Sequence, residues 1–182
     1  MARSVVLVQD IRKRYQWPES QLNFWLFFFF ASCATVLGIF AYFITVQNQL
    51  QLGTPWIFPY EVTITSLSIL FLILMWVLIN QRQLLPGIVI VGSFILFVLW
   101  LAGLIETAIE LFGPTGGVSG NCNLYVNSVP FKGVSVGTLA YLEQMNICQS
   151  WEAAFAFEVV GTVFLFWMMI MSWQVNQDEY EN

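Results

Sequence analysis

The chain has 182 residues, of which 58% are hydrophobic and 9% charged. Soluble domains carry about a quarter charged residues, so this composition excludes a water-soluble fold. The formal net charge of -5 comes with no histidine and no basic stripe, which argues against nucleic-acid binding and against bound haem or transition metals. We therefore expect one membrane domain, spanning 1–182, with no cofactor and no metal site.

Four apolar segments follow a polar N-terminal segment, residues 1–21. Each is long enough to cross a bilayer as a helix, and the first is too long and too aromatic for a cleaved signal peptide. The predicted spans are residues 22–46, 62–79, 87–112 and 151–173. The sequence thus predicts an all-α membrane protein, a bundle of four transmembrane helices.

The connecting segments are rich in the glycine, proline and polar residues that end helices. The third connector, residues 113–150, is the longest, and a short acidic tail, residues 174–182, ends the chain. Lys and Arg resist translocation. Four of them precede the first span and Arg82 lies in the second connector, whereas the first and third connectors hold only Lys132. Both termini are therefore expected in the cytosol, with residues 113–150 as an outer loop.

Small residues recur at helical spacing within the spans. Because lipid is as apolar as a helix surface, helices in membranes associate through close contact at such residues. We expect these positions to face the bundle interior, with the phenylalanines around them facing lipid or a partner; the alternative is a chance pattern. The positions are Ala31, Ala34, Gly38 and Ala41 in the first span, Gly92 and Gly103 in the third, and Ala154 and Gly161 in the fourth.

Three carboxylates lie within the predicted spans. Glu106 and Glu158 would both lie about 10 Å inside the outer ends of their helices, and Glu110 lies one turn from Glu106. We expect Glu106, Glu110 and Glu158 to form an intramembrane acidic cluster, with Glu61 and Glu152 at the helix mouths as further candidates. Intramembrane carboxylates are costly and often mark function.

Two interpretations of this acidic cluster remain open. Protonated carboxyl groups would hydrogen-bond within the bundle and set the helix register. Alternatively, the cluster would bind or conduct a cation or a proton, or pair with a basic residue of another protein, because adjacent like charges cannot all stay ionised in a low dielectric.

The three cysteines have different expected roles. Cys33 lies mid-helix and is interpreted as a packing residue. Cys122 and Cys148 lie in the predicted outer loop, where an oxidising compartment favours a disulfide. Free thiols or a metal pair are the alternatives, although two cysteines without histidine make a poor zinc site.

The layout resembles the MARVEL-type four-helix membrane proteins, especially the fungal ones. The resemblance covers most of the chain and rests on the basic N-terminal segment, Pro59-Tyr60-Glu61-Val62, Trp100-Leu101-Ala102 and the stretch CQSWEAAFAF from Cys148. It implies an M-shaped topology and a role in organising membrane domains or in trafficking. The acidic third and fourth spans and the short acidic tail depart from many members.

The expected function is that of a non-enzymatic tetraspan scaffold in the plasma membrane or the secretory pathway. Its expected partners are the lipid bilayer and other membrane proteins or further copies of itself. The alternative is an accessory subunit or small carrier for cations or protons that uses the acidic cluster. A membrane enzyme is disfavoured because only carboxylates are available as a general base.

Overall fold

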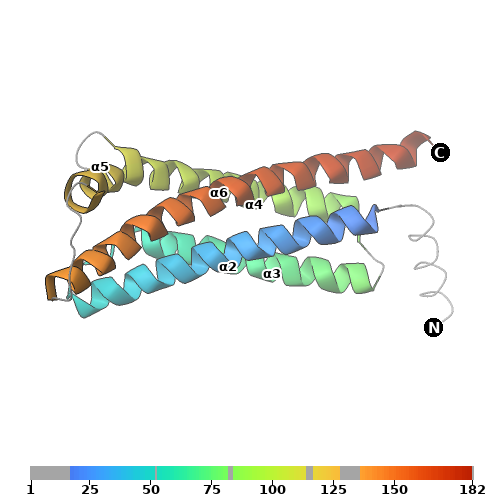
Figure 1. Cartoon of the computed structure of the whole chain (residues 1–182). Helices are drawn as coiled ribbons and strands as arrows, with labels where there is room; N and C mark the ends of the chain where they lie inside the picture. Colours follow the sequence, from blue (N-terminus) through green and yellow to red (C-terminus); the bar gives the residue numbers. More distant parts are fainter. Residues whose placement is uncertain (1–16, 52, 82–83, 114–116, 128–135, 182) are drawn as a thin grey trace.

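The structure is a computed structural model that describes residues 17–51, 53–81, 84–113, 117–127 and 136–181 (Figure 1). Four long helices make up most of this part of the chain, and it contains no strand. They are α2 (Glu19–Gln49), α3 (Ile57–Asn80), α4 (Pro86–Phe112) and α6 (Val136–Glu181). Each contains a stretch long and apolar enough to cross a membrane, which confirms the all-helical, multi-pass class.

The four long helices form a ring. α2 packs against α3 and α6, and α4 packs against α3 and α6, so α3 and α6 lie opposite each other. Figure 1 shows that α2 begins and α6 finishes at one end of the bundle, which we name the terminal end. The short helix α5 (Val118–Cys122) lies at the other end, which we name the loop end.

The helix α3 begins five residues earlier than the predicted start at residue 62. It begins at Ile57, so Pro59 is its third residue. A proline in the first turn costs no hydrogen bond because the first four N–H groups of a helix have no partner within it. The earlier start brings Glu61 into the helix, on the face that includes Phe58 and Ile64 among its buried residues.

The helix α6 also differs from the prediction, which placed its start at residue 151. It runs for 46 residues from Val136, and its apolar part extends from Leu142 to Gln177. No glycine or proline occurs between Gly137 and Gly161, so nothing local ends the helix where its polarity rises. Thirty-six helical residues measure about 54 Å, longer than a hydrocarbon core of about 30 Å.

A disulfide joins the outer connector to α6. Cys122, the last residue of α5, is bonded to Cys148 with the two Cα atoms 6.0 Å apart. A π-helical turn, η1 (Asn123–Asn127), follows α5. The predicted disulfide is therefore confirmed, and Cys33 is a free, buried cysteine.

The inward face of α2 is aromatic, contrary to the prediction. Ala34, Gly38 and Ala41 are exposed, Ala31 is half-buried, and a Cβ at Gly38 would meet nothing within 4 Å. The buried residues of this helix include Phe29, Cys33, Val36, Phe40 and Phe43. The two faces share the same helical period, and the bundle buries the one whose large side chains fill the space inside the ring.

The interior of the bundle is centred on Trp100 of α4, which is 1% exposed. Its indole N–H donates to Ser68 Oγ on α3 at 2.8 Å, and its ring lies 5.5 Å from that of Phe29 on α2. The same ring lies against Gly161 on α6, where a Cβ would overlap it. One side chain therefore contacts all three other long helices.

The glycines of α4 and α6 allow close packing inside the ring. Gly92 lies against Phe71, and Gly103 lies against Glu61. Ala154 and Gly161 share the buried face of α6 with Glu158. These positions, unlike those of α2, face other helices of the bundle.

Substituting Gly161→Ala should lower the free energy of unfolding by about 1–3 kcal/mol, because the added Cβ overlaps a Trp100 ring that is held in place by its hydrogen bond. Gly38→Ala is the matched control. It should be neutral or stabilising by up to about 1 kcal/mol, since alanine has the higher helix propensity. Denaturation in mild detergent measures both, and equal effects would contradict this packing.

Thiol labelling checks the disulfide. Native protein should label weakly, denatured protein at one cysteine (Cys33), and denatured and reduced protein at three. Labelling of three cysteines without reductant would contradict the Cys122–Cys148 bond.

Candidate functional site

Two buried glutamates lie near each other inside the bundle, toward its loop end. Glu61 of α3 and Glu158 of α6 are each 1% exposed, and they lie close enough to interact electrostatically. Because α3 and α6 occupy opposite positions in the ring, the two side chains extend into its interior. We name them the Glu61–Glu158 pair.

The helix α4 supplies the surroundings of the pair. A Cβ at Gly103 would overlap Glu61 Oε1, so the absence of a side chain there makes room for the carboxyl group. One turn later, Thr107 Oγ donates to Glu158 Oε1 at 3.1 Å. Thr107 is fully buried, so this bond is shielded from solvent and lipid.

Other polar groups near the pair are satisfied by backbone carbonyls. Thr65 donates to the Glu61 carbonyl at 2.6 Å, and Thr162 donates to the Glu158 carbonyl at 2.8 Å. Tyr60 donates to the Leu99 carbonyl at 3.0 Å, joining α3 to α4. Both Glu61 oxygens and Glu158 Oε2, in contrast, have no hydrogen-bond partner among the described residues.

Aromatic side chains close the bundle on the loop side of the pair. Phe40 and Phe43 of α2 pack on Phe58 of α3 and on Trp151 of α6, with ring centroids between 5.3 and 6.0 Å apart. Phe58 lies one turn before Glu61, and Trp151 lies two turns before Glu158. Trp100 lies on the terminal side, so aromatic rings flank the carboxyl groups on both sides.

The described residues contain no basic side chain, because all six Lys and Arg residues fall outside them. Among these residues no group of three metal-ligating side chains is assembled either. The three unpartnered carboxyl oxygens of the pair are suited to holding a proton or to accepting hydrogen bonds.

The predicted acidic cluster is wrong in its membership. Glu110 and Glu152 are exposed and Glu106 is only half-buried. The neighbour of Glu158 is Glu61, which the sequence offered only as a further candidate. The buried face of α4 runs through Leu96, Trp100, Gly103, Thr107 and Leu111, and Glu106 lies beside this face.

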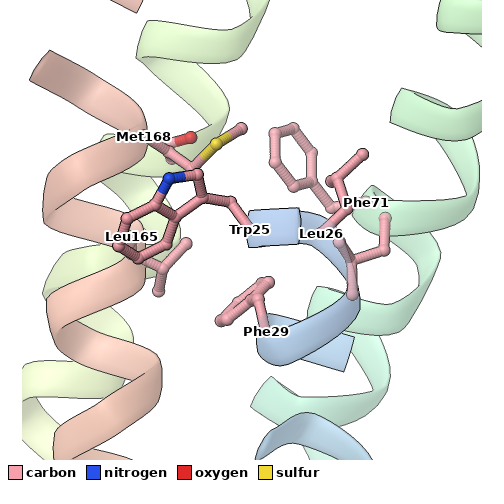
Figure 2. Close-up of a pocket in the computed structure, with 8 residues that line it drawn as sticks. Trp25, Leu26, Phe29, Phe71, Leu165 and Met168 are labelled. Atoms are coloured by element: carbon pink, nitrogen blue, oxygen red, sulfur yellow. The ribbon is translucent and has the colours of Figure 1, made fainter. Parts of the chain in front are cut away.

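A small cavity lies nearer the terminal end, between α2, α3, α4 and α6 (Figure 2). Its volume is about 10 Å³, at the lower limit for one water molecule. Trp25 and Phe29 line it on the α2 side and Leu165 and Met168 on the α6 side. Ser93, whose hydroxyl has no hydrogen-bond partner among the described residues, also lines it.

The sequence did not predict the positions of two residues of the site, Thr107 and Glu61. Thr107 carried no signal beyond its position one residue after Glu106. Glu61 was predicted at a helix mouth. Proline is tolerated in the first turn of a helix, so Pro59 was compatible with an earlier helix start that would include Glu61.

Comparisons with protein-family models, with curated proteins and with solved structures find no match to this chain.

Replacing the buried Thr107 hydroxyl tests the contact with Glu158. Thr107→Val should lower the free energy of unfolding by about 1–3 kcal/mol, because a buried carboxyl oxygen loses its donor. Thr63→Val is the control, since the Thr63 hydroxyl is exposed and bonds its own helix at Pro59. Denaturation in mild detergent measures both, and equal changes would contradict a role for Thr107 in the site.

Proposed function

We propose that this chain is a non-enzymatic tetraspan scaffold that organises membrane domains or partner proteins laterally. The single observation that carries the proposal is the outward position of the small residues on α2. We name Ala34, Gly38, Ala41 and Thr45, all of them exposed, the α2 outer face. The resemblance of the sequence layout to MARVEL-type proteins supports the same role.

The α2 outer face has the properties of a helix-association surface. Small residues allow two helix backbones to approach closely, and such contact drives helix association within a bilayer. The open space around Gly38 leaves room for that approach. Elsewhere the outward faces of the bundle carry large apolar side chains suited to lipid, such as Ile73, Trp76, Phe94 and Phe166.

The proposed topology has both termini in the cytosol and the disulfide on the opposite side. An even number of crossings leaves both ends on one side, and in the proposed topology that side would hold five of the six Lys and Arg residues. A disulfide at the loop end supports an oxidising lumenal or extracellular compartment there. We propose the plasma membrane or the secretory pathway as the location.

A second candidate function is an accessory subunit or carrier for protons or cations. The unpartnered, buried oxygens of the Glu61–Glu158 pair favour it, because buried ionisable groups in membranes often mark ion pathways. Flux of protons or Na⁺ through purified protein in vesicles, abolished by Glu61→Gln, would support the carrier.

The scaffold proposal predicts that a bulky residue on the α2 outer face disrupts association. Gly38→Leu should weaken self-association or partner capture in mild detergent by roughly tenfold or more, about 1.4 kcal/mol. The bundle itself should stay folded, since the added side chain points into open space. Cross-linking and size-exclusion chromatography with light scattering measure the change.

Ala102→Leu is the matched control, because Ala102 is an exposed small residue on α4. Its association should equal that of the unsubstituted protein. If both variants associate normally, or both lose association equally, the α2 outer face is not the surface used.

A further inference from the structure

The charges of the Glu61–Glu158 pair require a neutralising group that the described residues do not provide. Two adjacent carboxylates inside a bundle would repel each other and would lose their hydration without compensation. The neighbouring ionisable groups add no positive charge. Tyr60 donates to Leu99, Cys33 lies next to Ser68, and Glu106 is acidic and half-buried beside Thr107.

A basic residue from another protein does not fit the pair. Each carboxyl-bearing residue is 1% exposed, and Phe40, Phe58 and Trp151 cover the approach from the loop end. A lysine or arginine from a neighbouring helix would have to displace these rings. Partner pairing, one of the open interpretations of the sequence, is therefore disfavoured by the burial of both side chains.

A metal cation fits less well than a proton. Calcium takes six to eight oxygen ligands and magnesium about six. The pair offers three unpartnered oxygens, and the remaining Glu158 oxygen already accepts from Thr107. The backbone carbonyls nearby belong to continuous helices. A proton, in contrast, removes one charge and supplies one hydrogen-bond donor without needing further ligands.

We propose that the Glu61–Glu158 pair is a proton-binding site, in which Glu61 carries the proton and donates it in a hydrogen bond to Glu158 Oε2. Neither Glu61 oxygen accepts a hydrogen bond, so Glu61 is the less stabilised of the two as a carboxylate. Glu158 accepts from Thr107 and is the better acceptor. The bond joins α3 to α6, the opposite helices of the ring.

Gly103 gives this site its geometry. The Glu61 carboxyl occupies the volume that a side chain at residue 103 would fill, and Thr107 extends from the same face of α4 one turn later. One helix therefore makes room for the donor and positions the acceptor. This inference goes beyond lateral scaffolding and does not depend on any partner, because it concerns the interior of a single chain.

Infrared spectroscopy of the purified protein in lipid vesicles, taken as the difference between spectra in H₂O and in D₂O, tests the proposal. The carbonyl stretch of a protonated carboxylic acid is separate from the carboxylate bands and shifts in D₂O. The unsubstituted protein should show this band at neutral pH. Glu61→Gln should lose it, and it should still fold because the glutamine amide can donate to Glu158 Oε2. Glu158→Gln should keep the band at a shifted frequency, since Glu61 then donates to an amide oxygen.

Glu106→Gln and Glu110→Gln are controls that should leave the band unchanged. Three results would overturn the proposal: no protonated band in the unsubstituted protein at neutral pH, a band that survives in Glu61→Gln, or a band that disappears when NaCl or CaCl₂ is added at constant pH. The last result would assign the site to a cation. The measurement on unsubstituted protein does not depend on the folding of any variant.

Discussion

Hydrocarbon offers no hydrogen bonds, so every polar side chain that this bundle buries depends on partners within the protein. Apart from Ser93, Ser172 and the Glu61–Glu158 pair, which keep oxygens without a partner among the described residues, buried side chains meet this constraint in two ways. Threonine and serine hydroxyls bond to carbonyls of their own helices, as Thr65 and Ser68 do. Trp100 and Thr107 bond across helices instead. These interhelical bonds fix which helix faces pack together, because sliding or rotating a helix would leave a buried donor without an acceptor.

Close packing of side chains adds to the stability that the polar contacts provide. Because the hydrophobic effect does not favour helix over lipid as a neighbour, packing in the bilayer depends on van der Waals contact. Large rings from α2 fill the interior at Phe29, Phe40 and Phe43, while glycines on α4 and α6 receive the side chains that reach them. Trp100 against Gly161, Phe71 against Gly92 and Glu61 against Gly103 are such fits. The disulfide adds a covalent tie outside the packed interior, between α5 and α6.

Interior and exterior thus have separate roles in the proposed function. The acidic pair lies between aromatic rings inside one chain, which suits a contribution to internal stability and register. The α2 outer face lies where another helix has access to it, which suits lateral association. A scaffold needs both properties, a bundle that holds its own shape and a surface that remains available.

Length and hydropathy determined the class of the protein and the number of apolar spans, because both depend on composition over a long window. The disulfide was expected because Cys122 and Cys148 both fall in the predicted outer loop, and the structure places Cys148 within α6. Helix ends were less accessible: Pro59 lies in a first turn where it is tolerated, and α6 continues past polar residues that do not break a helix. Only the tertiary structure decided which face of α2 is buried and which glutamate joins Glu158. Both faces of α2 repeat with the same period, so the sequence of α2 does not distinguish them. Which face is buried depends on the space left by α3 and α6.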